Sequence, residues 1–174
     1  SPDEFPGNRA GVLRNAHRAP SLRWFHTMSA GVDSPIFDRL LERGVRLTTS
    51  SSASAVPIAQ AVVLDLLALT RRLPEARAHQ AAHRWERLMG RDVAGATIVI
   101  AGMGPIGYEV ARLALALRMR PIGLRRTVTG EEPCETWTLD RWHEAIAAAD
   151  HLVLALPLTP STKGLLDAAS IARL

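Results

Sequence analysis

The clearest hydrophobic pattern in the chain is an apolar, β-branched run over residues 96–101, followed at once by glycines and then by a second apolar segment. The run Ala-Thr-Ile-Val-Ile-Ala shows no polar alternation, which predicts a strand buried on both faces of a parallel sheet. Residues 108–117 are good helix formers with neither Gly nor Pro among them, so they predict a helix. Strand, glycine-rich turn and helix therefore follow one another.

Two further apolar runs predict strands of the same sheet. They cover residues 120–124 and 150–155, and a helix is predicted between them over residues 139–149. We expect the three strands to lie in the spatial order 3-2-1 with right-handed crossovers, leaving one apolar edge of the central strand open. Asp167 is expected to cap a last helix over residues 168–174.

The first third of the chain has shorter elements that predict a small parallel β-α-β unit. They are a strand, a helix and a second strand, over residues 22–27, 35–43 and 45–49. A run of small residues, 50–55, is the best hinge candidate, and after it we expect a long helix opened by Pro57 and a further helix towards Leu88. These patterns divide the chain into one unit over residues 1–54 and another over residues 55–174.

Composition narrows the class of protein without identifying it. With 47% apolar and 22% charged residues among 174, the chain is expected to be globular, and no apolar run reaches the roughly 18 residues that span a bilayer. The single cysteine, Cys134, excludes an internal disulfide and favours a reducing cytoplasm. Apart from Lys163, arginine carries the positive charge behind the net +4, and no aromatic residues alternate with it in a basic stripe. We therefore expect neither a nucleic-acid nor a membrane partner.

The glycine-rich turn Gly102-Met-Gly-Pro-Ile-Gly107 matches the G-x-G-x-x-G pattern of dinucleotide-binding turns. In that pattern Gly102 allows the tight turn, Gly104 lets the backbone approach a pyrophosphate, and Gly107 lets the helix lie close to the strand. Pro105 is compatible with the first helical turn, where its missing N–H has no helical partner. The setting predicts a pyrophosphate at the start of the helix.

The end of the second predicted strand indicates which dinucleotide is preferred. An NAD-binding unit commonly has an acidic residue there to accept from the ribose 2′-OH, whereas this chain has Arg125-Arg126-Thr127. A guanidinium can grip a 2′-phosphate that a carboxylate would repel. We therefore favour NADP over NAD. The alternative is that Arg125 and Arg126 are ordinary exposed residues and that the backbone holds the adenosine.

His79 and His83 have the i, i+4 spacing of two metal ligands on one helix face, and Glu75 lies one turn earlier. The HExxH arrangement is missing, however, and the spacing indicates no third ligand. We interpret the three residues as a solvated helix face and predict no metal site.

Four segments occur in the order of one known family. They are Leu22-Arg-Trp with Ser29-Ala-Gly-Val-Asp33, the helix after Pro57, the glycine-rich turn, and Leu156-Pro-Leu-Thr-Pro-Ser-Thr-Lys-Gly-Leu165, of which the last is the most specific. From about Gly11 onwards the chain thus resembles the D-isomer-specific 2-hydroxyacid dehydrogenases, which include glyoxylate/hydroxypyruvate reductases and phosphoglycerate dehydrogenase. The resemblance implies an α/β fold: the first mononucleotide half of a Rossmann-type, doubly wound parallel sheet, preceded by a remnant of a flavodoxin-like substrate-binding domain.

The resemblance also implies roles for individual residues. The backbone of Ala30, Gly31 and Val32 is similar to the loop that receives the substrate carboxylate. The residues similar to cofactor contacts are Gly104, Pro105 and Ile106 at the pyrophosphate, Arg125, Arg126 and Thr127 at the adenosine ribose, and Leu156, Pro157 and Thr162 on the ribose and nicotinamide side. The implied reaction is hydride transfer between NAD(P)H and a small 2-oxo acid such as glyoxylate or hydroxypyruvate. A homodimer formed through the long helices is implied as well.

Some positions depart from the family's pattern. Gln60 stands where a glutamate is usual, and Ala53 where a glycine is common. The family's catalytic arginine, histidine and glutamate follow the point at which this chain ends, and Arg173 and His151 occupy the wrong motif positions to replace them. The resemblance therefore implies no catalytic residue here, and we expect a fragment of an enzyme that shows no turnover alone.

Two other functions remain open at the level of sequence. A non-catalytic nucleotide-binding or dimerisation module would keep the fold and the cofactor without the chemistry. A methyltransferase with a glycine-rich loop would want an acidic residue at the end of the second strand, where this chain has Arg125.

Overall fold

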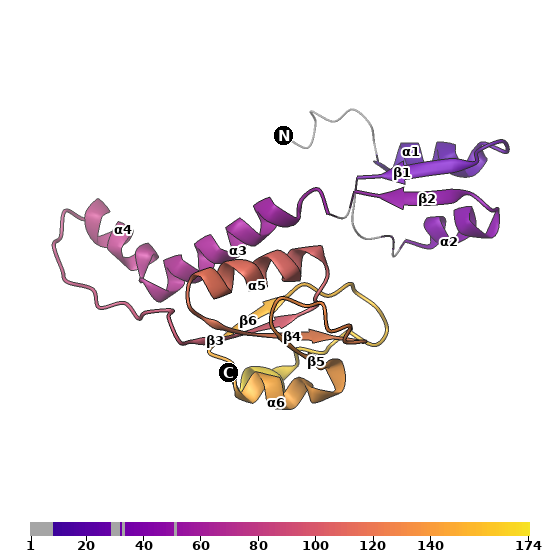
Figure 1. Ribbon diagram of the computed structural model, residues 1–174. Helices are drawn as coiled ribbons and strands as arrows, with labels where there is room; N and C mark the ends of the chain where they lie inside the picture. The colour runs from indigo at the N-terminus through magenta and orange to yellow at the C-terminus, as the bar shows by residue number, and fades with distance from the viewer. Residues whose placement is uncertain (1–8, 29–31, 33, 51) are drawn as a thin grey trace. The chain divides into compact units, whose positions relative to one another are not determined.

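The computed structural model describes residues 9–28, 32, 34–50 and 52–174, which form two compact units, 1–53 and 54–174 (Figure 1). The division falls within the run of small residues at 50–55. Each unit contains its own parallel sheet, and the larger one carries the glycine-rich turn.

The smaller unit has the β-α-β order that its sequence predicts. Helix α1 (Arg9–Arg18) precedes strand β1 (Trp24–Thr27), helix α2 (Pro35–Glu42) and strand β2 (Arg46–Thr49). The two strands pair in parallel, with His26 opposite Thr48. Its core consists of fully buried apolar side chains from α2 and from the residue that precedes β2, namely Phe37, Leu40 and Val45, with Phe25 and Leu47 packed against them.

The larger unit begins with two helices, α3 (Ala55–Thr70) and α4 (Leu73–Ala81). Helix α3 starts two residues before Pro57, which was expected to open it. Proline is tolerated there because the first four N–H groups of a helix have no helical partner. Helix α4 ends at Ala81, well before Leu88, and residues 84–93 have no regular secondary structure.

The rest of the larger unit alternates strands and helices. In chain order the elements are β3 (Thr97–Ala101), α5 (Pro105–Ala116), β4 (Arg120–Arg125), β5 (Glu135–Thr138), the short 3₁₀ helix η1 (Leu139–Arg141), α6 (Trp142–Ala147), β6 (His151–Leu154) and α7 (Ala168–Ile171). All pairings in the sheet are parallel. The expected α/β class is confirmed, and so is the cap of the last helix, where the Asp167 carboxylate accepts from the Ser170 N–H at 2.7 Å.

The strand order corrects two expectations. The sheet runs β5-β4-β3-β6, so β6 lies beside β3 and not beside β4, and β3 has a partner on both edges. The expected open edge on the central strand is therefore wrong. The 3-2-1 half does exist, but its third strand is β5, a segment for which no strand was predicted. Strand β6 pairs with the other edge of β3.

Helices cover both faces of this sheet, α3 and α5 on one and α6 on the other (Figure 1), and a hydrophobic cluster accompanies each layer. Alternate residues of β3 point to opposite faces. Ile98 and Ile100 pack with buried residues of α3 and α5, whereas Val99 and Ala101 pack with Trp142 and its neighbours on α6. Covering on both faces explains why the β3 sequence is continuously apolar.

Candidate functional site

The turn between β3 and α5 is built by two glycines that the protein's own packing requires. Gly102 has a φ of +106°, and a Cβ on it would lie 2.5 Å from the carbonyl oxygen of Ala155. A Cβ on Gly107 would lie 1.9 Å from the carbonyl oxygen of Gly102. The tight turn predicted at Gly102 and the close helix–strand approach predicted at Gly107 are therefore both confirmed.

Gly104 differs from both, because no residue that the structure describes requires its lack of a side chain. It precedes Pro105 at the start of α5, its φ of −83° is open to any residue, and a Cβ built on it meets no described atom within 4 Å. The backbone at Gly104 thus faces open space at the N-terminus of a 12-residue helix, where the dipole and the first N–H groups favour an anion. Ile106 lies in the same first turn. The arrangement fits the pyrophosphate of a dinucleotide.

The loop after β6 adjoins the glycine-rich turn. The Ala155 N–H donates to the Ala101 carbonyl at 2.7 Å, which brings residues 156–163 beside the end of β3. In this loop the Thr162 hydroxyl donates to the Pro157 carbonyl at 2.6 Å and accepts from the Thr159 N–H at 2.8 Å. The Thr162 hydroxyl therefore holds the shape of the loop.

A pocket of about 230 Å³ opens at the same place. Its lining is largely apolar and comes from the end of β6 and the loop after it: Leu154, Leu156, Pro157, Leu158, Thr162, Gly164, Leu165 and Leu166. The structure thus brings Leu156, Pro157 and Thr162 together next to the glycine-rich turn, at the carboxyl ends of the strands, where open α/β sheets bind ligands.

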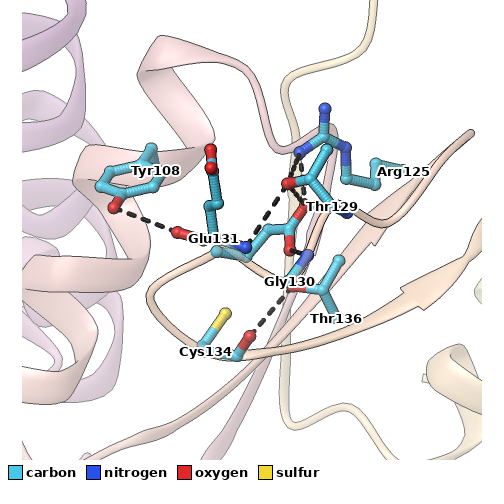
Figure 2. Close-up of polar contacts among 8 residues, drawn as sticks. Tyr108, Arg125, Thr129, Gly130, Glu131, Cys134 and Thr136 are labelled. Carbon is cyan, nitrogen blue, oxygen red and sulfur yellow. Dashed lines mark hydrogen bonds and ion pairs between the residues drawn. The ribbon is translucent and has the colours of Figure 1, made fainter.

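The arginine pair at the end of β4 is divided between two environments. Arg125, labelled in Figure 2, donates to the carboxylate of Glu132 through Nη1. Its side chain is 32% exposed. Arg126 is exposed and forms no ion pair with any residue that the structure describes, and Thr127 beside it is also exposed. The two arginines are therefore not equivalent, because Arg125 is paired with a carboxylate and Arg126 is exposed.

Glu132 is the residue that sequence reasoning missed. Its side chain is 3% exposed, and its carboxylate accepts from the Thr129 N–H at 3.0 Å, the Thr129 hydroxyl at 2.8 Å and the Gly130 N–H at 2.8 Å, besides Arg125. These hydrogen bonds, that of the Thr129 N–H foremost, lower the pKa of Glu132 to about 2, although partial desolvation acts in the opposite direction. The loop is thus folded around the Glu132 carboxylate, which is negatively charged at neutral pH.

The same loop is tied to the helix that begins at the glycine-rich turn. The Tyr108 hydroxyl, from the start of α5, donates to the Glu131 carbonyl at 3.3 Å (Figure 2). On the β5 side, the Thr136 hydroxyl donates to the Cys134 carbonyl at 3.0 Å, and burial raises the pKa of the Cys134 thiol. The loop after β4 is therefore hydrogen-bonded both to α5 and to β5.

The smaller unit has a polar cluster of its own. Of the predicted carboxylate loop, Ala30 and Gly31 lie outside the described residues and Val32 is exposed. Near the carboxyl ends of β1 and β2, the two ring nitrogens of His26 lie 2.9 Å from the hydroxyls of Thr48 and Ser50. Sequence reasoning missed this cluster, although pairing the two strands in parallel register would have placed His26 opposite Thr48.

The histidine pair does not share a helix face. Helix α4 ends at Ala81, and His83 adopts a left-handed φ of +50° beyond it, while His79 lies 3.6 Å from the Glu86 carboxylate. No group of three potential metal-ligating side chains was found in the described part of the chain. Within the same residues, every helix is too short or too polar to cross a membrane.

Comparison with known proteins gives a consistent result. The model of the D-isomer specific 2-hydroxyacid dehydrogenase NAD binding domain matches residues 63–174. Human glyoxylate reductase/hydroxypyruvate reductase is 31% identical over 157 residues, which are 83% of this chain and 46% of that protein. D-3-phosphoglycerate dehydrogenase of Methanocaldococcus jannaschii is 28% identical over 159 residues, 89% of this chain and 30% of that protein. The chain thus spans less than half the length of either curated relative.

Solved structures agree with the sequence matches. The NADPH-dependent glyoxylate/hydroxypyruvate reductase of Sinorhizobium meliloti, in complex with NADP and sulfate, superposes with a TM-score of 0.78 at 29% identity. The match covers 93% of this chain and 51% of that one. A probable 2-hydroxyacid dehydrogenase from Rhizobium etli, also in complex with NADP, gives a TM-score of 0.76 at 25% identity, over 93% of this chain and 51% of that one.

Proposed function

The chain belongs to the D-isomer specific 2-hydroxyacid dehydrogenase family, and from that premise we propose that its larger unit binds NADP(H) for hydride transfer from the reduced cofactor to a small 2-oxo acid, and for the reverse transfer from the 2-hydroxy acid to the oxidised cofactor. When bound, the cofactor supplies the hydride. The residues of this chain bind and orient it: the backbone at Gly104, Pro105 and Ile106 holds the pyrophosphate, with Gly102 and Gly107 shaping the turn.

The observation that carries this proposal is the open space at Gly104. Gly102 and Gly107 are explained by contacts inside the protein, whereas Gly104 is explained neither by its φ nor by its neighbours. A ligand whose atoms come close to the backbone there accounts for the missing side chain. The apolar pocket beside Leu156 and Pro157 supports placing the ribose and nicotinamide side of the cofactor at the end of β6.

We favour NADP over NAD on the charge at the end of β4. Arg126 is a cation without an acidic partner among the described residues, and Arg125 and Thr127 stand on either side of it. A dianionic 2′-phosphate gains charge-assisted hydrogen bonds there that a ribose hydroxyl does not. The relatives in complex with NADP are consistent with this preference.

We further propose that residues 1–54 are part of a substrate-binding domain, with Ala30, Gly31 and Val32 at the substrate carboxylate. Glyoxylate or hydroxypyruvate is the proposed 2-oxo acid, because relatives at 29% and 31% identity are named as reductases of these compounds. We assign no catalytic residue within the 174 residues. The chain alone is therefore proposed to bind cofactor without turnover, in a reducing, cytoplasmic setting.

Titration of the 174-residue chain with NADPH and NADH, followed by the fluorescence of the reduced nicotinamide, tests the assignment. We expect NADPH to bind at least about tenfold more tightly than NADH, the worth of one charge-assisted hydrogen bond. Arg126→Gln should remove most of that difference. Binding of neither cofactor would contradict the dinucleotide assignment, equal affinities would contradict the NADP preference, and reduction of glyoxylate would contradict the expected lack of turnover.

A second function, assembly, is favoured by the apolar surface of α3 and of the segment after α4. The exposed fraction is 63% for Leu64, 71% for Leu69 and 94% for Trp85. Large exposed apolar side chains on consecutive elements are typical of an interaction surface. We propose a homodimer formed through this surface, which is compatible both with an enzyme and with a non-catalytic dimerisation module.

A further inference from the structure

The side chain of Glu132, within the loop that follows β4, is almost completely buried, and its carboxylate holds one end of Arg125. We propose that Glu132 is a positioning residue for cofactor choice: it fixes Arg125 so that the remaining N–H edge of its guanidinium binds the 2′-phosphate of NADP(H), while Arg126 supplies the uncompensated charge. This inference rests on the proposed NADP-binding function and names a residue that acts through another.

Glu132 is held so firmly that it can serve as an anchor. Both carboxylate oxygens are occupied, Oε1 by Thr129 and Arg125 and Oε2 by the Gly130 N–H at 2.8 Å. Backbone N–H groups supply two of these bonds, so the position of the charge is set by the chain itself. Such a group does not swing out to meet a ligand, because leaving would strip a buried carboxylate of its partners.

Arg125 is fixed at one end and available at the other. Nη1 is the atom engaged with Glu132, and it also lies 3.4 Å from the Thr129 hydroxyl. A guanidinium has five N–H donors in a rigid fork, and Nε and Nη2 of Arg125 have no partner among the residues that the structure describes. The side chain as a whole is 32% exposed, so part of it is accessible to a ligand. A pre-oriented arginine loses less side-chain entropy when a phosphate binds.

Charge balance explains why two arginines are needed. The positive charge of Arg125 is offset by Glu132, so it contributes direction more than net charge. Arg126 is exposed and unpaired within the described chain, so its charge is not offset by a direct carboxylate contact. The Tyr108 hydroxyl, bonded to the Glu131 carbonyl at 3.3 Å, connects this arrangement to α5, whose first turn is the proposed pyrophosphate site.

An opposite effect of Glu132 is conceivable from charge alone, since a carboxylate near the ribose repels a 2′-phosphate and favours NAD. The geometry argues against it, because the Glu132 side chain is 3% exposed and its oxygens face donors inside the loop. The two effects differ in sign. Removing the charge weakens NADPH binding if Glu132 positions Arg125, and strengthens it if Glu132 repels the phosphate.

The test compares Glu132→Gln with Glu131→Gln in the 174-residue chain, titrating each with NADPH and NADH. Glu131 is exposed in the same loop and its side chain makes none of the Glu132 contacts, so it controls for the loss of one negative charge. We expect Glu132→Gln to weaken NADPH binding about tenfold and to leave NADH within about twofold, while Glu131→Gln leaves both within about twofold. Unchanged or tighter NADPH binding by Glu132→Gln overturns the proposal, and so does an equal loss for both cofactors.

Two further variants show whether Glu132 acts through Arg125. In an Arg125→Gln background, Glu132→Gln should cause no further loss of NADPH over NADH, and an undiminished loss there overturns the proposal. Thr129→Val removes one hydroxyl anchor while keeping every charge, which serves if Glu132→Gln does not fold. It should reduce the preference for NADPH severalfold, and an unchanged preference contradicts the inference.

Failure of the positioning role is distinguishable from failure of the proposed function. A wild-type chain that binds neither cofactor, or both equally, refutes the NADP assignment and the inference with it. A wild-type chain that prefers NADPH, together with a Glu132→Gln variant that keeps the same preference, refutes the inference alone. Adenosine 2′,5′-bisphosphate, titrated against AMP, should give the same ratios, since it probes the adenosine end without the nicotinamide.

Discussion

The carbonyl oxygen of Gly102 occupies the position where a side chain of residue 107 would begin, because a Cβ built on Gly107 lies only 1.9 Å from it. The obstacle is the backbone of Gly102, which directly follows β3. The Ile100 side chain is also close, 3.2 Å from the same Cβ position. The start of α5 therefore lies so close to the end of β3 that no side chain fits between the two backbones at residue 107.

Gly107→Ala should destabilise the larger unit, because β3 and α5 must move apart to admit a methyl group. Overpacking of this kind typically costs about 1–3 kcal/mol, and backbone displacement places this variant at the upper end or beyond. Urea denaturation followed by circular dichroism measures the loss. A midpoint equal to that of the wild type would mean that the turn is much looser than the structure indicates.

Gly104→Ala is the matched variant three residues earlier, and it should separate binding from stability. A methyl group there meets no described atom within 4 Å, and the φ of −83° suits alanine, so the urea midpoint should stay the same or rise slightly. The methyl group would enter the space proposed for the pyrophosphate. NADPH affinity should fall by about tenfold or more, the loss of roughly 1.4 kcal/mol, and unchanged affinity would place the cofactor elsewhere.

Much of the larger unit could be predicted because its signals are local. The apolar run of β3, the helix formers of α5 and the three glycines each act within a few residues of one another. Strand β5 was missed because its four residues, Glu135–Thr138, follow a polar loop, although Thr136 and Thr138 alternate with Trp137 and Glu135 in the manner of an edge strand. The order of the strands depends on contacts between distant segments, and missing β5 misplaced β6.

The candidate site, like the fold, could be predicted only where its signals are local in the sequence. The turn and the arginine pair could be read from motifs, but the partner of Arg125 could not. Glu132 lies seven residues further along in a loop without periodicity, and it was only one of several acidic residues near the end of β4. Its role depends on the loop closing so that the N–H groups of Thr129 and Gly130 converge on one carboxylate. No rule based on residue spacing predicts that arrangement of the loop.

The ionisation of Glu132 should make the fold sensitive to acid. Its pKa is about 2 in the folded chain, compared with an ordinary value of 4.5. A group whose pKa is lowered by folding stabilises the fold fully above its unfolded pKa, and this contribution disappears as the pH falls towards the folded pKa. Stability should therefore decline between pH 4.5 and pH 2, and Glu132→Gln should flatten that part of the profile while lowering stability at neutral pH.

Thermal melting between pH 7 and pH 2 measures this linkage in the apo chain. Glu131→Gln is the control, since it removes a neighbouring carboxylate and leaves every contact of Glu132 in place. It should follow the wild-type profile. If Glu132→Gln shows the same acid dependence as the wild type, the carboxylate is not held in its charged form by Thr129 and Gly130.

A buried hydrogen bond should hold α7 against α6. The Trp142 indole N–H donates to the Ser170 hydroxyl at 3.0 Å, and Ser170 is fully buried. Ser170→Ala leaves the indole N–H without its acceptor, which should cost about 1–3 kcal/mol. Trp142→Phe in the Ser170→Ala background should add less than it does alone, because the group left unsatisfied is then gone. Additive losses in urea denaturation would show that the bond is unimportant.

The apolar surface of α3 should determine whether the chain is a monomer or a dimer. Leu64 and Leu69 are largely exposed, and changing both to Gln replaces that surface without removing a buried contact. If two chains cover this surface, the wild type should elute as a dimer in light-scattering chromatography and the double variant as a folded monomer. Ile171→Gln, at an exposed apolar residue of α7, is the control and should remain dimeric. The substitutions remove the free energy that a dimer would gain by burying Leu64 and Leu69. A monomeric wild type, or a double variant that stays dimeric, would therefore show that α3 is not the interface.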